Sequence, residues 1–433
     1  MVSLNKKSLT FILYDWATSP ITTIHTTFIF SVYFVEKIAV ENGSFIWGVI
    51  IAIAAMLTAF MGPILGSYAD KKRKRKLILF FLTILGGFST MLLWFAKPGI
   101  DYLVFASIFS CISIFTMEVV FVLYNSLLSS STNKKNYGIL SGLSWGAGYV
   151  AGIISLLLCL VLFIFPEKLM FGLTKENGEN IRACMLFISI WMMVFAIPLF
   201  IFTSEPKKNK TKKSTFQYIK QGCIFIFNEK LIFRFFLSRL FYFDALATLF
   251  AFGGIYASNV FDFSTKEILY FAILINLSAA LGAIIGGFYD RIISSFRVIQ
   301  CCIIALIAFG IFLILIKNEI YFWIVSFFLG LFIGPLQSSS RVLISDLVPS
   351  KKGGQFFGFA IFSGKITSFL GPLAYGFLIL IFDDHRIGMC FVIILLIFSF
   401  LILGQKNPLL KNCLLYTSDS AADRSCVDLG GGR

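Results

Sequence analysis

Five charged side chains lie inside long apolar stretches of this sequence: the acids Asp15, Glu118 and Asp244, and the bases Arg239 and Lys365. Charges inside a membrane span are costly, so they usually pair with one another or bind substrates and coupling ions. Their types favour binding of a charged solute or of a proton. Each charge taken alone fits a permanent internal salt bridge equally well, but five such groups are not all expected to be inert pairs.

Three uncharged polar side chains accompany these charges. His25 lies in the middle of the first apolar stretch, where it either hydrogen-bonds a neighbouring helix or relays protons, because its pKa is near physiological pH. Asn125 and Gln337 are expected to face a cavity rather than lipid. The sequence has two histidines, no clustered metal ligands, no nucleophile with an adjacent base and no P-loop. We therefore expect no metal, no cofactor, no direct use of ATP and no enzyme activity.

The composition of the chain indicates that these residues lie in membrane-embedded segments. Hydrophobic residues make up 58% of the 433 residues, and charged residues make up 14%. A single soluble core stops growing at roughly 250–300 residues, so much of this apolar surface must face the lipid bilayer. These values exclude a soluble enzyme, a coiled coil and a disordered protein. The formal net charge of +15 sits in short clusters between apolar stretches, which argues against a nucleic-acid partner.

Twelve apolar stretches are long enough to cross a bilayer as α-helices, for which about 20 residues suffice. They are continuous rather than alternating, which argues against a transmembrane barrel. Lysine and arginine gather in one set of loops, and the positive-inside rule then places both termini in the cytoplasm. The predicted spans are 9–35, 45–68, 77–96, 102–128, 138–165, 181–202, 231–257, 266–289, 298–316, 320–344, 354–382 and 387–404.

The spans fall into two sets of six around one polar stretch. We predict an N-terminal half at 1–203, a basic cytoplasmic linker at 204–230, a C-terminal half at 231–405 and a tail at 406–433. The part of the linker at 216–227 can form a helix on the membrane surface. The last residues, 413–433, differ in composition from the rest and resemble the translation of a sequencing adapter, so we expect them to be an artefact.

The two halves carry an internal repeat with an offset of 220 residues. Gly62, Gly66, Asp70 and Lys71 recur at 282, 286, 290 and 291, and the glycine at 138 recurs at 358. Parallel repeats of this kind place the substrate path between the halves near the membrane midplane. We therefore expect the embedded charges to pair across the halves. Pairs of glycines four residues apart either pack helices closely or slide as the halves rock.

The loop after the second span combines a glycine, an acid and several bases between Gly66 and Arg75. This pattern resembles the loop motif of the major facilitator superfamily, although Arg73 stands where a second glycine is usual, which predicts an altered turn. Asp70 is expected at the cytoplasmic membrane edge. An anion there can cap a helix N-terminus, where unpaired amides and the helix dipole favour negative charge.

The repeat predicts the partners of the two aspartates. Asp70 is expected to meet the start of the eleventh span near Gly354, and Asp290 the start of the fifth near Gly138. Such contacts form only when the cytoplasmic side is closed, so they would bias a gate. The alternative is a basic loop with no gating role. The candidate gating residues are Gly66, Asp70, Lys71, Arg75, Gly286, Asp290 and Arg291.

A narrower resemblance begins with the first span, where residues 14–19 read Tyr-Asp-Trp-Ala-Thr-Ser. This segment resembles the opening signature of the vacuole-effluxer-like family within the same superfamily. Further matching segments are 124–128, 141–149, 239–244, 252–256, 334–341 and 357–372. The resemblance covers about residues 10–405. It implies kinship with autophagy-related vacuolar amino-acid exporters and their bacterial homologues, but it says little about the substrate.

We therefore predict an all-α membrane protein with twelve transmembrane helices in two six-helix halves, the major facilitator fold. The predicted function is secondary transport of a small polar metabolite by alternating access, and the resemblance implies an amino acid, with protons as the coupling ion. Arg239 or Lys365 would hold a carboxylate, and Asp15 or Asp244 an ammonium group or a proton. The alternatives are a drug, sugar or peptide transporter, and a non-transporting receptor or assembly protein. The expected location is the bacterial inner membrane.

Overall fold

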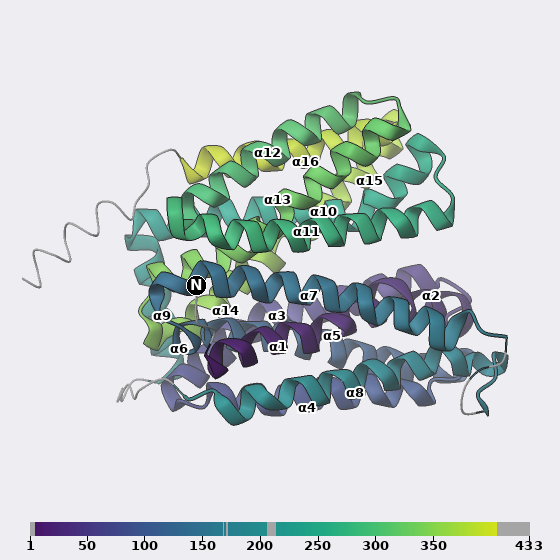
Figure 1. Cartoon of the computed structure of the whole chain (residues 1–433), viewed down its shortest axis with the longest axis horizontal. Helices are drawn as coiled ribbons and strands as arrows, with labels where there is room; N and C mark the ends of the chain where they lie inside the picture. Colours follow the sequence, from purple (N-terminus) through teal and green to yellow (C-terminus); the bar gives the residue numbers. More distant parts are fainter. Residues whose placement is uncertain (1–4, 168, 170–171, 206–213, 405–433) are drawn as a thin grey trace, which may run out of the picture.

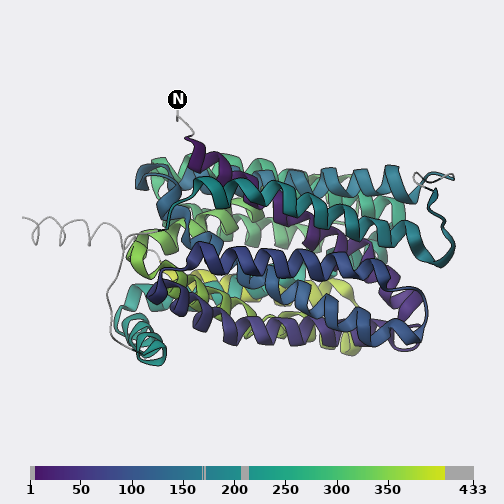
Figure 2. The same cartoon turned by 90° about the horizontal axis from the view of Figure 1, so that it is seen from below.

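The computed structural model describes residues 5–167, 169, 172–205 and 214–404, and these form an all-helical protein. Figures 1 and 2 show the long helices running side by side along one axis, and Figure 1 shows α1–α8 in one layer and α10–α13, α15 and α16 in another. The helices are α1 Lys6–Pro20, α2 Phe30–Tyr33, α3 Gly43–Lys72, α4 Arg75–Leu92, α5 Leu103–Ser126, α6 Leu128–Ser131, α7 Tyr137–Cys159, α8 Glu179–Phe202, α9 Thr215–Asn228, α10 Lys230–Phe261, α11 Thr265–Ile293, α12 Ser295–Leu315, α13 Glu319–Leu347, α14 Gly353–Lys365, α15 Leu370–Phe382 and α16 His385–Leu403.

Eleven helical stretches of the described chain are long and apolar enough to cross a membrane. They correspond to eleven of the twelve predicted spans. The predicted span 354–382 consists of two helices, α14 and α15. The first predicted span, 9–35, is instead a series of shorter segments: α1, a π-helix over Ile21–Phe28, and α2. Pro20 causes the change because it has no N–H for the carbonyl of Trp16. That carbonyl accepts a bond from Trp191 Nε1 at 3.1 Å.

The apolar side chains gather into two cores. The buried cluster of α1–α8 contains Val342 as its one contribution from the second layer. The buried cluster of α9–α16 contains Val122 as its one contribution from the first. Each layer is therefore a helix bundle with a core of its own, and the two bundles meet over a polar and glycine-rich interface. The predicted tail and part of the predicted linker lie outside the described residues.

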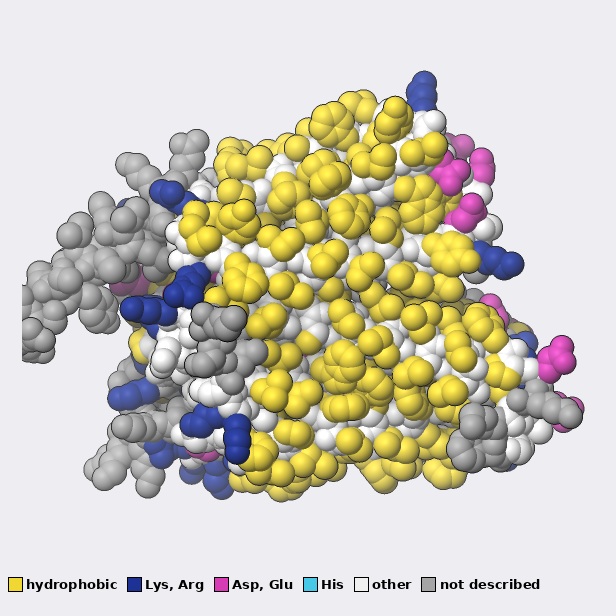
Figure 3. All heavy atoms as spheres, in the orientation of Figure 1, with side chains coloured by type: hydrophobic (Ala, Val, Ile, Leu, Met, Phe, Trp, Pro, Cys, Tyr) yellow, Lys and Arg dark blue, Asp and Glu magenta, His cyan; other side chains and the backbone are white. Residues whose placement is uncertain are grey.

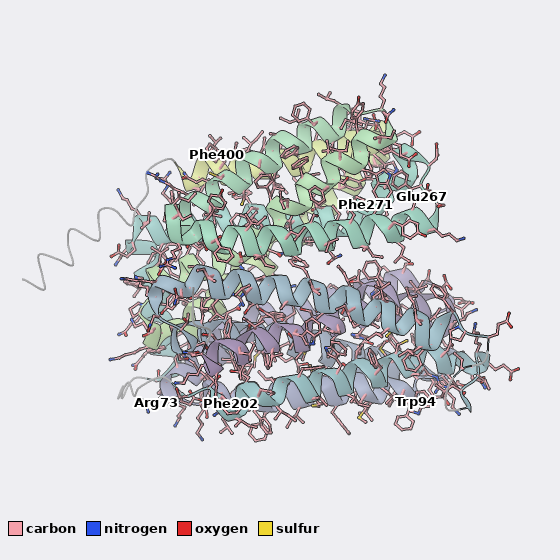
Figure 4. All side chains as sticks on the ribbon, viewed as in Figure 1. Arg73, Trp94, Phe202, Glu267, Phe271 and Phe400 are labelled. Atoms are coloured by element: carbon pink, nitrogen blue, oxygen red, sulfur yellow. The ribbon has the colours of Figure 1, made fainter. Side chains whose placement is uncertain are left out.

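The two ends of the bundles differ in charge. Figure 3 shows a wide apolar belt on the visible face, with Lys and Arg at the end where α1 begins and most of the acidic side chains at the other. We call the first the basic end and the second the opposite end. Figure 4 places Arg73, Phe202 and Phe400 toward the basic end and Trp94 and Glu267 toward the opposite end. Large apolar side chains such as Phe81, Leu373 and Leu401 are more than 60% exposed on the belt, as lipid contact requires.

Glycines bring the two bundles together toward the basic end. There α7 packs against α11, and α3 packs against α14. A Cβ on Gly142 would lie 2.9 Å from the Cα of Gly287, and one on Gly358 would lie 2.6 Å from the carbonyl oxygen of Gly62. Neither distance is tolerated by a real side chain, so close backbone contact requires glycine at these positions.

Candidate functional site

The first corner of the interface lies where α3 meets the start of α14. Asp70 Oδ1 accepts a bond from the Gly354 amide at 3.1 Å, and Oδ2 accepts one from the Gln355 amide at 2.9 Å. Arg75 Nε lies 2.5 Å from Oδ1, and both side chains are at most 4% exposed. Arg75 also donates to the Ser350 carbonyl of the other bundle at 2.9 Å. The predicted contact between Asp70 and the eleventh span is confirmed, and an arginine reinforces it.

The second corner lies where α11 meets the start of α7. Asp290 lies beside Gly138, as predicted, because a Cβ on that glycine would collide with the Cβ of Asp290. The expected bond to an α7 amide is absent from the described contacts, and Asp290 Oδ1 instead accepts a bond from Ser339 Oγ of its own bundle at 2.8 Å. The reason is steric, since the backbones of Gly138 and Gly287 are in direct contact. An ion pair of Lys134 and Asp346 closes the rim of this corner at 3.6 Å.

A buried network crosses the interface between the two corners. Arg341 Nη1 of α13 lies 3.1 Å from Asp15 Oδ2 of α1, and it also donates to Asn125 Oδ1 at 3.2 Å. The remaining nitrogens of Arg341 donate to the hydroxyl and the carbonyl of Ser141, each at 2.8 Å. Tyr124 donates its hydroxyl to Asp15 Oδ2 at 2.9 Å. Both charges are thus compensated, and every bond from Arg341 reaches the other bundle.

A second ion pair crosses the interface farther from the basic end. Lys365 Nζ, at the end of α14, lies 2.7 Å from Glu118 Oε1 of α5, and these side chains are 28% and 31% exposed. Gln337 Oε1 of α13 accepts a bond from the Tyr149 hydroxyl of α7. The expected pairing of embedded charges across the halves is therefore found twice, for Asp15 and for Lys365 with Glu118.

Arg239 and Asp244 have no partner of opposite charge among the described residues. Arg239 is 7% exposed, stacks 3.7 Å above the Phe243 ring, and donates to the Ala360 carbonyl and, at 3.3 Å, to Ser363 Oγ. Asp244 is 1% exposed and accepts the Gly371 amide at 3.1 Å.

Arg239 and Asp244, both on α10, therefore form hydrogen bonds on either side of a break in the eleventh span. The chain leaves helical geometry between the end of α14 at Lys365 and the start of α15 at Leu370. The guanidinium of Arg239 donates to the Ala360 carbonyl and the Ser363 hydroxyl near the end of α14, and the carboxylate of Asp244 accepts the Gly371 amide at the start of α15. Each charge matches the helix dipole that it meets. A discontinuous helix near the middle of a span is typical of substrate sites in transporters.

His25 is separate from this interface. It is fully buried in the first bundle, where Nε2 shares a 3.1 Å hydrogen bond with Ser110 Oγ and the ring packs against Phe30 and Trp47. All of these contacts come from its own bundle. The structure therefore does not bring His25 together with the charged candidates.

Of the remaining gating candidates, some contact the other bundle and some do not. Gly66 meets the Gly354 carbonyl of the other bundle, whereas Gly286 meets Pro335 of its own bundle. The glycine that faces the other bundle at the second corner is Gly287, one residue later. Lys71 and Arg291 form no ion pair among the described residues.

Sequence reasoning also missed Arg341 as an embedded charge. It falls inside the predicted span 320–344, but it is not among the embedded charges named from the sequence. Its position within an apolar stretch was the signal that would have identified it.

Comparisons with known proteins agree with this architecture. The family model described as "Vacuole effluxer Atg22 like" matches residues 128–406, and the model described as "Major Facilitator Superfamily" matches residues 4–156. A Bacillus subtilis protein named "Uncharacterized MFS-type transporter YxiO" is 23% identical over 383 residues, covering 86% of this chain and 88% of that protein. Autophagy-related protein 22 of Vanderwaltozyma polyspora is 26% identical over 376 residues, covering 75% and 70%.

Solved structures resemble the chain over almost its whole length. The transporter FucP, solved in the outward conformation and described elsewhere as the E. coli fucose:proton symporter, has a TM-score of 0.72 at 12% identity, with 94% of this chain and 99% of that chain covered. The human organic anion transporter MFSD10 has a TM-score of 0.69 at 12% identity, with 93% and 98% covered. At these identities the likeness concerns the fold alone.

Proposed function

The chain belongs to the vacuole effluxer Atg22-like family of the major facilitator superfamily, and from this premise we propose that its substrate is a zwitterionic amino acid. The protein is a secondary transporter and not an enzyme. Transporters of this fold expose a central site to one side of the membrane at a time as their two halves rock.

The basic end of the interface is closed in this structure. The first corner joins Asp70 to Gly354, the second packs Gly138 against Gly287, and Arg341 joins the bundles between them. Opening this end would break all three sets of contacts. We assign them to the gate rather than to substrate binding, because Asp70 is already paired with Arg75 and Asp15 with Arg341.

The observation that carries the substrate proposal is the isolation of Arg239 and Asp244. Both are almost fully buried, and neither has a partner of opposite charge among the described residues; their hydrogen bonds go to neutral groups around the break in the eleventh span. A carboxylate would bind the guanidinium of Arg239 more strongly than a carbonyl does, because hydrogen bonds between ions are roughly twice as strong as neutral ones. An ammonium group would replace the Gly371 amide at Asp244. One anionic and one cationic group on a single small solute fit this pair.

Protons are the proposed coupling ion, and Glu118 with Lys365 is the proposed place of binding. This ion pair joins the two bundles, yet both side chains are about 30% exposed, unlike the other embedded charges. Protonation of Glu118 would remove the attraction that holds Lys365 and would loosen one link between the halves. The pair thereby offers a way to connect proton binding to rocking.

The decisive experiment is reconstitution of the full chain into liposomes with a panel of labelled amino acids, with and without a proton gradient. We expect counterflow of at least one amino acid, and a rate that depends on the gradient. Sugars, peptides and drugs in the same assay serve as competitors. Absence of counterflow with every amino acid, or counterflow of a sugar alone, would overturn the substrate assignment.

A matched pair of variants on α10 tests the site itself. Arg239→Gln should weaken amino-acid binding about tenfold or more, because hydrogen bonds to charged groups contribute about 1.5–3 kcal/mol. Arg234→Gln is the control, since Arg234 is exposed near the basic end and donates to the Ile402 carbonyl. Equal losses in the two variants would show that Arg239 is not a substrate ligand.

We further propose that the basic end faces the cytoplasm of a bacterial cell, as the positive-inside rule requires. Lys351 and Lys317 are exposed at the basic and opposite ends, respectively. In a background without native cysteines, Lys317→Cys should react with an impermeant thiol reagent on intact cells, and Lys351→Cys should not. The reverse labelling pattern would invert the orientation.

A further inference from the structure

The helix α9 is the one long helix of the described chain that does not run along the bundles. It covers Thr215–Asn228 and starts with a capping box, in which Ser214 and Gln217 bond each other's backbone. Figures 1 and 2 show it at the basic end, lying across the ends of the spanning helices. It also follows a lysine-rich stretch of sequence at 207–213.

The inner face of α9 is docked on the gate. Tyr218, Gly222 and Ile226 are buried, and Gln355 Nε2 donates to the Tyr218 carbonyl at 2.7 Å. A Cβ on Gly222 would lie 2.7 Å from the side-chain amide carbon of Gln355, so the two are in tight contact. Phe225 lies edge-on to the Phe356 ring at 5.6 Å. The helix α9 therefore packs against the first turn of α14.

The outer face of α9 combines large apolar side chains with lysine. Phe216 is 76% exposed, Phe227 is 68% exposed and Ile224 is 48% exposed. Helical periodicity of 3.6 residues per turn places these three on one side, around the exposed Lys220. Lys230, just beyond the helix, is exposed as well. Phe227 also lies 5.4 Å from the Phe233 ring of α10, and the strip stays largely exposed in the described part of the chain.

We propose that this outer face of α9 binds the anionic phospholipids of the adjacent membrane leaflet. Aromatic side chains on an amphipathic helix sink into the boundary between headgroups and acyl chains. Lysines beside them are attracted to anionic lipid, each by about fivefold in affinity. The five lysines of the preceding sequence at 207–213 add positive charge of the same kind. This combination of charge and aromatic surface fits a charged lipid surface better than a protein groove.

Lipid binding at α9 would act on the gate through Gln355. The side chain of Gln355 holds α9, and its backbone amide donates to Asp70 at 2.9 Å. A helix attached to the leaflet therefore keeps the first turn of α14 near the membrane surface, where it meets Asp70. Anionic lipid is thus expected to favour the state that is closed at the basic end.

The test uses the full chain in nanodiscs, in a background without native cysteines, with an environment-sensitive fluorophore on Ile224→Cys. Emission should shift to the blue in nanodiscs of phosphatidylcholine with phosphatidylglycerol, and much less in phosphatidylcholine alone. The measured quantity is the phosphatidylglycerol fraction at which half of the blue shift is reached. Adding Lys220→Gln should raise this fraction severalfold. Lys317→Gln, at the opposite end, is the matched control and should leave it unchanged.

Two results would overturn the proposal. Emission typical of water in both lipids would show that the face does not touch the membrane, and equal shifts in both would show that lipid charge is irrelevant. Folding of each variant is checked by gel filtration. The readout involves no transported solute, so its outcome is independent of the amino-acid assignment.

Discussion

The two corners of the interface have the same origin in the sequence repeat but different chemistry. At the first corner, Asp70 has the Arg75 guanidinium at 2.5 Å and two backbone amides of the opposite bundle. At the second, the described contacts of Asp290 include a serine hydroxyl and no cation. Ser295 stands 220 residues after Arg75, so the repeat has a serine where an arginine would reach Asp290.

This difference shows that one corner is held by charge and the other by packing. The ion pair of the first corner is at most 4% exposed, so water and salt screen it little. The ion pair at the rim of the second corner includes Lys134, whose side chain is 69% exposed, and such surface pairs contribute only about 0–1 kcal/mol. The glycine contacts of α7 and α11 must therefore provide most of the closing force there.

The strongest test of this comparison replaces each aspartate in turn. Asp70→Asn leaves Arg75 buried without its counter-ion, which should cost the closed state about 3–5 kcal/mol. Asp290→Asn removes no ion pair and keeps the Ser339 bond, so the cost should stay within about 1 kcal/mol. Labelling of Ser338→Cys, a buried interface position, by a thiol reagent from the basic end measures opening. Equal labelling of the two variants would contradict the distinction.

The packing side of the comparison is tested by adding one methyl group. Gly142→Ala would press its Cβ against the backbone of Gly287 and should destabilise the closed state by about 1–3 kcal/mol. Gly48→Ala is the matched control, because its Cβ would meet nothing within 4 Å. Labelling of the same buried cysteine and the transport rate report the effect. If Gly142→Ala behaves like Gly48→Ala, the helices are not in close contact when the gate is closed.

Supplying the missing arginine would make the corners more alike. Ser295→Arg gives Asp290 a charge partner, which should stabilise the closed state by about 1.5 kcal/mol or more. Cysteine labelling from the basic end should then fall about tenfold, and counterflow should slow because the gate opens less often. The same substitution combined with Asp290→Asn is the control, and its benefit should vanish. Faster labelling in the single variant would show that the corner has no room for an arginine.

The smallest effect is expected at the turn beside the first corner. Arg73 has φ of 55° and ψ of 47°, a left-handed conformation that glycine adopts more readily than arginine. Arg73→Gly should relieve strain and raise stability by up to about 1 kcal/mol, measured as a small rise in the thermal midpoint in detergent. A lower midpoint would mean that the Arg73 side chain stabilises the loop.

The sequence by itself determined the membrane spans, the two distinct ends and one contact between the halves. Hydropathy is a local property of about 20 residues, and helices in a bilayer must satisfy their own backbone, so spans can be read from the chain. The offset of 220 residues related the halves and predicted the contact of Asp70 with Gly354. The segmentation of the first span was not predicted, because its cause is a single proline within an otherwise continuous apolar run.

Tertiary structure alone decided which charges are paired and which are left over. Asp15 with Arg341 and Glu118 with Lys365 are separated by 326 and 247 residues, and hydropathy gives no register between such distant helices. Arg239 and Asp244 likewise form hydrogen bonds around a helix break next to α10, between α14 and α15. No local sequence pattern predicted this break. Ion pairs need side-chain atoms within a few ångströms, and that distance is fixed by the rotation and tilt of helices against one another.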